Sequence, residues 1–152
     1  MLLTVTAFAA EKGYGAKGAA TDDKLTLQSM MTYTLEEEYL ARANYKAART
    51  MTGSAKPFTE MIKNSDADIE KMKRIIAEHQ LTAPDDNSKI HVTFPFDFNS
   101  AKHAGEKMET ERSAMYERFL REPELPNDIR ILFVQMQNTA RKNLCVFQRW
   151  ST

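Results

Sequence analysis

The sequence predicts an all-α protein, folded as an antiparallel four-helix bundle with one long connection between its second and third helices. Three observations lead to this fold class. Four stretches carry apolar residues at alternating steps of three and four, which is the spacing of one buried face of an α-helix. Glycine and proline residues end and separate these stretches. The length of 152 residues suits one ordinary domain, because two domains with full cores need a longer chain.

The four helices are expected at residues 24–51, 57–80, 99–121 and 126–149. Residues 21–23 are polar and are expected to cap the first helix, which Gly53 ends. Pro57 suits the first turn of the second helix, since a helix needs no backbone N–H there. Asn99 and Ser100 are expected to cap the third helix.

The lengths of the connections decide the topology. Short connections join the first helix to the second and the third to the fourth, so each pair should form an antiparallel hairpin. Residues 81–98 are long for an unstructured loop, so this crossover should run along the bundle and bury its aromatic side chains. Two hairpins joined by one long crossover form the ferritin-like topology.

Residues 1–23 are expected to precede the helical domain, which covers residues 24–152. Residues 1–10 are apolar and resemble the second half of an export signal, with Ala7 and Ala9 spaced as before a cleavage site. This predicts a periplasmic or secreted protein. A cytoplasmic protein is the alternative, in which these residues form a first apolar turn. The Gly- and Ala-rich residues 11–22 suit a flexible lead-in.

Composition and charge exclude several classes of function. Lys plus Arg and Asp plus Glu both number 21, so there is no net positive charge to attract phosphates, and no nucleic-acid partner is expected. No apolar stretch reaches the roughly 18 to 20 residues of a membrane-spanning helix, so no membrane span is expected. The single Cys145 cannot form an intramolecular disulfide, and no Cys/His cluster is present for zinc. Packing must therefore hold the fold together.

Two short motifs lie on the expected first and third helices. Glu38, Ala41, Arg42 and Tyr45 match Glu-x-x-Ala-Arg-x-x-Tyr, which resembles the first-helix motif of rubrerythrins. Residues 104–109 read Ala-Gly-Glu-Lys-Met-Glu, which resembles the third-helix motif Ala-Gly-Glu-x-x-Glu of the same family.

A second resemblance extends over more of the chain. Residues 35–42 and the Leu-Thr-Ala-Pro of residues 81–84 resemble an uncharacterised branch of secreted bacterial and archaeal ferritin-like proteins. Together, the likeness to the ferritin-like superfamily covers roughly residues 25–150. It implies a rubrerythrin-like bundle built to hold a pair of iron or manganese ions.

The resemblance implies metal ligands at particular positions, but this sequence supplies only some of them. Glu38 matches the carboxylate ligand of the first helix, Glu109 matches its partner on the third, and Glu106 matches the additional third-helix carboxylate. The three histidines lie away from every ligand position of the family pattern. A normal di-iron oxidase is therefore not expected.

Both Glu-x-x-His pairs of the family are lost. The second helix has Ser65 and Asp68 at these positions, and the fourth helix has Ala140 and Asn143. Asp68 can reach inward where a histidine would stand, which gives an all-oxygen set of ligands. The candidate metal ligands are Glu38, Asp68, Glu106 and Glu109. Such a set favours one hard divalent cation, Mn²⁺, Ca²⁺ or Mg²⁺, over a redox pair of iron ions, with a single Fe²⁺ as a further candidate.

Two hypotheses of function follow. In the first, the chain is a ferritin-like bundle whose degenerate di-metal site binds one hard cation. In the second, it is a metal-free structural or protein-interaction bundle. Arg112, three residues after Glu109, then balances the buried glutamates, and Tyr45 and Asn143 can donate hydrogen bonds. Neither hypothesis favours an enzyme. In either, a second copy of this chain is a candidate partner, through a helix face or the crossover.

Overall fold

The computed structural model describes residues 13–53, 56–95 and 97–150, and this part of the chain is helical, without strands. Its elements are α1 (Gly15–Thr21), α2 (Leu27–Thr52), α3 (Phe58–Glu78), the 3₁₀ turn η1 (Ser88–Ile90), α4 (Phe98–Phe119) and α5 (Asn127–Arg149). The all-α prediction is confirmed, and the four long helices begin and end within three residues of their expected bounds. The predicted export signal, residues 1–10, lies outside the described residues. No helix in the described ranges is long and apolar enough to cross a membrane.

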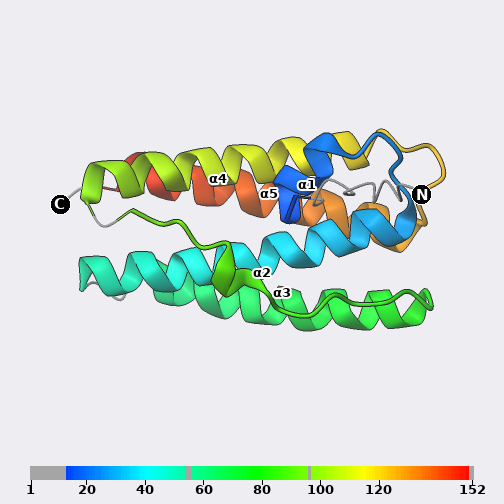
Figure 1. Cartoon of the computed structure of the whole chain (residues 1–152), viewed down its shortest axis with the longest axis horizontal. Helices are drawn as coiled ribbons and strands as arrows, with labels where there is room; N and C mark the ends of the chain where they lie inside the picture. Colours follow the sequence, from blue (N-terminus) through cyan, green and yellow to red (C-terminus); the bar gives the residue numbers. More distant parts are fainter. Residues whose placement is uncertain (1–12, 54–55, 96, 151–152) are drawn as a thin grey trace, which may run out of the picture.

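The four long helices lie side by side in two layers, with α4 and α5 in one layer and α2 and α3 in the other (Figure 1). Within each layer the two helices run in opposite directions and are joined by a short connection. The connection from α3 to α4 returns along the length of the bundle, so that α3 and α4 run in the same direction. The layers meet at the seam between α2 and α4, which α1 and this crossover partly cover.

Side-chain caps fix where α2 and α4 begin, at positions other than those expected. At the start of α2, Thr26 and Ser29 form a reciprocal capping box. At the start of α4, the Asp97 carboxylate accepts a hydrogen bond from the Ser100 amide at 2.9 Å. The predicted caps, residues 21–23 and Asn99 with Ser100, are therefore wrong by at least three and two residues, respectively. Gly53 ends α2 as expected, in the left-handed conformation with φ of 61°.

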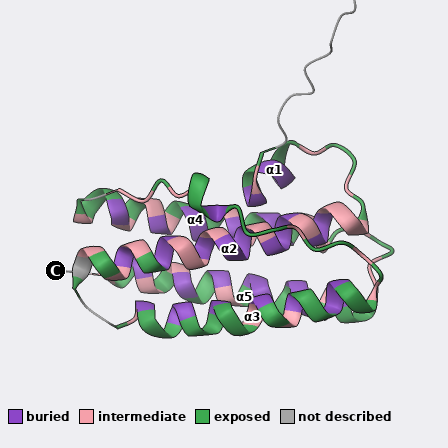
Figure 2. Ribbon diagram, turned by 60° about the horizontal axis from the view of Figure 1, so that its bottom comes forward, coloured by how far each residue is buried: buried purple, intermediate pink, exposed green. Residues whose placement is uncertain are grey.

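Buried residues occur along the whole length of the long helices (purple in Figure 2), and their apolar members form two clusters, one toward each end of the bundle. The larger cluster contains Leu35, Ile69, Phe119 and Phe133 among others. The smaller contains Tyr45, Phe58, Met108 and Phe147, with Phe94 and Trp150 packed on it. Along α2, the buried Glu37 and Glu38 lie between residues of the two clusters, so polar groups interrupt the core near its middle.

The expected flexible lead-in contains a helix, α1, that packs against α2 and α4. Ala16 and Ala19 are buried, and a Cβ at Gly18 would overlap the backbone of Gly13 and the ring of Tyr33. Small residues here allow helices to approach closely, whereas the sequence analysis took the same composition as a sign of flexibility. Two charged groups also hold α1. The Gly15 amide donates to Glu36 Oε2 at 2.9 Å, and Arg118 donates to backbone carbonyls near the end of α1.

Polar contacts hold the connection between α3 and α4 against the helices. The Gln28 side chain and the Thr82 backbone exchange two hydrogen bonds, of 2.8 and 2.9 Å. Arg42 forms ion pairs with Asp66 of α3 at 2.7 Å and with Asp86 of the crossover at 2.9 Å. Phe94 packs partly buried against the smaller apolar cluster, whereas Ile90 is 82% exposed.

Gly105→Val is expected to lower the free energy of unfolding by about 1–3 kcal/mol. A Cβ at Gly105 overlaps the ring of Phe147, which is fully buried with its centroid 5.8 Å from that of Phe58. Urea denaturation measures the change. Ala114→Val, at an exposed position of the same helix, is the control and should cost no more than about 0.7 kcal/mol. Equal midpoints for the two variants would contradict this account of the packing.

Candidate functional site

The core contains a fully buried arginine, Arg112 of α4, paired with two buried glutamates. Its Nη2 donates to Glu38 Oε2 of α2 at 2.6 Å, and its Nη1 donates to Glu109 Oε2 of α4 at 2.8 Å. Arg112 and Glu109 are 0% exposed, and Glu38 is 1% exposed. The guanidinium therefore links the two carboxylates that the sequence proposed as metal ligands.

The Tyr45 hydroxyl completes this group. It donates to Glu109 Oε1, and it accepts hydrogen bonds from Arg112 Nη1 at 2.8 Å and from Asn143 Nδ2 at 3.0 Å. A phenol offers one donor and two acceptor positions, so all three are used. The residues Glu38, Tyr45, Glu109, Arg112 and Asn143 are called the Arg112 cluster below. Arg112, Tyr45 and Asn143 are the residues that the second hypothesis named beside the glutamates, although Asn143 donates to Tyr45 and not to a carboxylate.

Helical spacing explains how the sequence brings the cluster together. Glu109 and Arg112 are three residues apart on α4, so their side chains share one face and can pair. Glu38 and Tyr45 are seven residues apart, about two turns, on the buried face of α2. The α2 and α4 faces meet across the core, so that a long arginine side chain from one helix reaches a glutamate of the other.

The cluster holds its charges in place. Burial disfavours the charged form of Arg112, but Glu109, Tyr45 and Glu38 outweigh that effect and hold its pKa well above the ordinary value. Burial raises the pKa of Glu109, while the Arg112 charge and the hydrogen bond from Tyr45 oppose the rise. Arg112 therefore stays a cation at every physiological pH, and it serves as the permanent counter-charge of the core.

Two further carboxylates lie next to the cluster. Glu37 is 3% exposed, and its Oε2 accepts the Ala16 amide of α1 at 2.8 Å. Burial raises the pKa of Glu37 to about 7, although the Arg112 charge and this hydrogen bond lower it. Asp68 of α3 is half-buried, and burial together with the charge of Glu38 raises its pKa to about 6. Carboxylates therefore outnumber the single guanidinium in this part of the core.

The structure brings together only some of the predicted ligands. Glu38 and Glu109 meet through Arg112, and Asp68 is close enough to interact with Glu38. Glu106 stays outside the cluster, because its side chain is 28% exposed and its carboxylate lies 3.8 Å from the ring of His103. Glu106 therefore lies toward the edge of the bundle, whereas Glu109 is 0% exposed in the core.

The residues present do not fit a pair of metal ions. Ser65, Ala140 and Asn143, which the resemblance places at ligand positions, offer neither carboxylate nor imidazole. Arg112 already donates to both Glu38 and Glu109. Within the described ranges, no three His, Cys, Asp or Glu side chains are grouped so that they could hold one ion.

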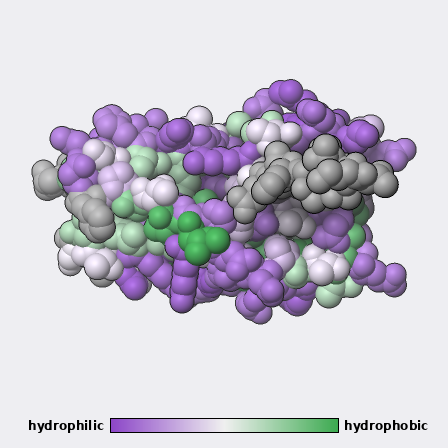
Figure 3. Space-filling model, viewed as in Figure 1, coloured by the Kyte–Doolittle hydropathy of each residue, from purple (hydrophilic) through white to green (hydrophobic). Residues whose placement is uncertain are grey.

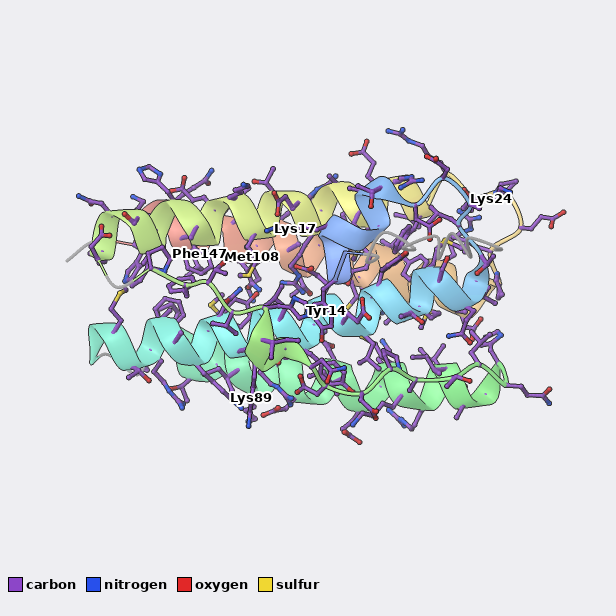
Figure 4. The ribbon with its side chains drawn as sticks, in the orientation of Figure 1. Tyr14, Lys17, Lys24, Lys89, Met108 and Phe147 are labelled. Atoms are coloured by element: carbon purple, nitrogen blue, oxygen red, sulfur yellow. The ribbon has the colours of Figure 1, made fainter. Side chains whose placement is uncertain are left out.

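The structure also contains a groove that the sequence did not predict, with a volume of about 1040 Å³ between α1, α2, α4 and the crossover. Its lining includes Tyr14, Glu37, Leu40, Asn44, Phe94 and Met108. The ring of Tyr14 stacks on that of His91, with centroids 4.1 Å apart, and so joins the start of α1 to the crossover. Figure 4 shows Tyr14 and Met108 between the α2 and α4 ribbons. No sequence signal marked this groove, because it exists only where four separate segments meet.

Comparisons of the chain with protein-family models, with curated proteins and with solved structures found no match. Function is therefore inferred from the Arg112 cluster and from the groove. These features lie on neighbouring faces of α2, and Glu37 both borders the cluster and lines the groove.

The free energy of unfolding is expected to fall as the pH rises from about 5 to about 7. The pKa of Glu37 is about 7 in the folded protein against an ordinary value of 4.5, so in this window the folded state binds more protons than the unfolded chain. The slope should approach about 1.4 kcal/mol per pH unit, and Asp68 should add a slope of the same sign below about pH 6. Urea denaturation at a series of pH values measures it.

Glu37→Gln tests the assignment, because glutamine keeps an acceptor for the Ala16 amide but cannot ionise. This variant should flatten the profile and be more stable than the parent at about pH 8. Glu78→Gln, at an exposed position of α3, is the control and should keep the parent slope. An unchanged slope in Glu37→Gln would show that another group titrates.

Proposed function

We propose that this protein is a metal-independent ferritin-like bundle that acts by binding a partner molecule and not by redox catalysis. The observation that carries the proposal is the fully buried Arg112, bonded to Glu38 at 2.6 Å and to Glu109 at 2.8 Å. In a di-metal bundle, the ions balance the buried carboxylates. Here a guanidinium that belongs to the chain itself balances part of their charge.

Two features support the ferritin-like part of the proposal. The helices form two antiparallel hairpins, and the crossover returns along the bundle between them (Figure 1). Glu38 and Glu109, the first- and third-helix glutamates of the resemblance, are both buried and share one guanidinium. Gly105 of the third-helix motif is buried where Phe147 leaves no room for a side chain. The motif positions therefore have a packing role that does not require metal.

The competing hypothesis is one hard cation, Mn²⁺, Ca²⁺, Mg²⁺ or Fe²⁺, held by Glu38, Asp68, Glu106 and Glu109. A cation that bound Glu38 and Glu109 would have to displace the guanidinium or share oxygens with it, and two cations close together repel. Glu106 would also have to turn from the edge of the bundle toward the core. The geometry favours the metal-free form for these reasons.

The groove supports binding as the kind of function. A mixed polar and apolar hollow of about 1040 Å³ has the size of a small-molecule site. Self-association is a second form of this role, since a hydrophobic patch lies over the crossover in the middle of the face in Figure 3, and Ile90 of the crossover is 82% exposed. Sedimentation velocity of the parent protein and of Ile90→Lys tests whether the protein self-associates through this patch.

The purified protein is expected to contain no stoichiometric metal, and its melting temperature should not change with about 1 mM Mn²⁺, Fe²⁺, Ca²⁺ or Mg²⁺. An ion that binds only the folded state would raise that temperature. Elemental analysis and differential scanning calorimetry give the two readouts. One bound ion per chain, with a rise in melting temperature that Glu38→Ala abolishes, would overturn the proposal.

Arg112→Met is expected to destabilise the protein by about 3–5 kcal/mol, because it leaves Glu38 and Glu109 buried without a counter-charge. Arg121→Met removes an exposed pair, 3.5 Å from Glu117, and should change stability by less than about 1 kcal/mol. Guanidinium chloride denaturation measures both.

A triple variant keeps the test informative if Arg112→Met does not fold. Glu38→Gln and Glu109→Gln added to Arg112→Met remove the two buried charges together with their partner, so most of the lost stability should return. A triple variant no more stable than Arg112→Met would show that the arginine contributes packing and not charge balance.

A further inference from the structure

We propose that the groove between α1, α2, α4 and the crossover binds an arylalkylamine, a molecule with an aromatic body, an ammonium group and a second N–H donor. This inference rests on the proposed binding role and gives it a ligand class. It does not depend on the charge balance at Arg112, which lies in the core and outside the lining of the groove. Three observations support the proposal: two buried hydrogen-bond acceptors, the spacing of these acceptors on α2, and the apolar surface between them.

Asn44 supplies the first acceptor. It lines the groove, is 9% exposed, and its Oδ1 is buried without a hydrogen-bond partner in the described part of the protein. The other end of the amide is already engaged, since Nδ2 donates to Met108 Sδ at 3.1 Å. A buried amide oxygen without a donor is costly, and an N–H group of a ligand would satisfy it.

Glu37 supplies the second acceptor. It also lines the groove and is 3% exposed, and the Ala16 amide is the donor to its Oε2. A carboxylate can accept more than one hydrogen bond, and its burial makes an ammonium partner more favourable than it would be in water. A cationic ligand would therefore pair with the Glu37 carboxylate.

The spacing of the two acceptors sets the shape of the ligand. Glu37 and Asn44 are seven residues apart on α2, so they lie on one face of the helix and about 10 Å apart along its axis. Leu40 lies on the same face between them, and Phe94 and Met108 line the groove from the crossover and from α4. The ligand must therefore carry a donor toward each end and an apolar body between them.

The charged groups at the rim of the groove are consistent with a cationic ligand. Lys17 and Lys107 line the groove but are exposed, and Lys107 Nζ lies 3.8 Å from Glu111. Figure 4 shows Lys17 on α1, above the seam in that view. Glu37 and Asn44 Oδ1 are buried acceptors of the wall, the buried Tyr14 hydroxyl can donate or accept, and the two lysines are at the surface. An organic anion would place its charge against Glu36 and Glu37, so the groove discriminates against it.

Tryptamine is the probe, because it has both an ammonium and an indole N–H. We expect it to bind the full chain with a Kd below about 1 mM, measured by isothermal titration calorimetry in buffer containing EDTA. Two related ligands, each lacking one of the two donor groups of tryptamine, test the two contacts separately. 1-Methyltryptamine lacks the indole N–H and should bind about 5-fold more weakly, while indole-3-acetate lacks the ammonium and should bind at least about 10-fold more weakly.

Variants assign the contacts to residues. Asn44→Leu should weaken tryptamine about 5-fold and remove the difference between tryptamine and 1-methyltryptamine, while Asn138→Leu, at an exposed position of α5, should leave both affinities unchanged. Ala104→Trp fills the groove from α4 without changing either acceptor and should abolish binding. It keeps the test decisive if Asn44→Leu does not fold.

The outcomes separate the ligand class from the proposed function. No heat of tryptamine binding, equal affinity for indole-3-acetate, or unaltered binding by Ala104→Trp would overturn the arylalkylamine site while leaving the metal-free bundle in place. Stoichiometric metal in the core would overturn the metal-free proposal instead. Tryptamine binding in EDTA that Ala104→Trp abolishes would support the groove site in either case.

Discussion

The charge pairing of Arg112 is the interaction on which the rest of this structure depends. A guanidinium that is 0% exposed is stable only if carboxylates and hydroxyls meet it at bonding distance. Glu38 and Tyr45 come from α2, Glu109 from α4 itself, and Asn143 of α5 reaches the group through the Tyr45 hydroxyl. Contacts between apolar side chains are not directional, whereas these hydrogen bonds and ion pairs form only at one relative position of the helices. The cluster therefore fixes how the two layers fit together.

The carboxylate excess around the cluster links the core to α1. Glu37 lies beside Glu38 in the sequence but accepts its hydrogen bond from the Ala16 amide at the start of α1. Glu36 Oε2 likewise accepts a hydrogen bond from the Gly15 amide at 2.9 Å. A chain of electrostatic contacts thus runs from the middle of the bundle to a short helix that would be marginal alone. The groove follows from this arrangement, because α1 and the crossover cover the α2–α4 seam without closing it.

Much of the fold was predictable because its signals are local. Apolar residues at helical spacing predicted the four long helices to within three residues of their observed bounds. The caps were harder, because Thr26 and Asp97 compete with neighbouring polar residues of equal capping ability. The α1 helix was missed since Gly and Ala suit both a flexible linker and a tightly packed helix, and only the surfaces of α2 and α4 decide between them.

For the site, the period of an α-helix predicted from the sequence alone that Arg112 would share a helical face with Glu109, whereas the expectation that Glu38 and Glu109 face the core came from the family resemblance. The sequence could not determine which cation pairs with Glu38 and Glu109. A bound metal ion has no residue of its own in the sequence, and an arginine three residues away can pair with many different carboxylates. The tertiary structure decided this by placing Arg112 Nη2 at 2.6 Å from Glu38 of another helix. It also placed Glu106 at the edge of the bundle, and it buried Glu37 and Asn44 beside a groove. These outcomes depend on contacts between segments far apart in the chain, and no local pattern encodes such contacts.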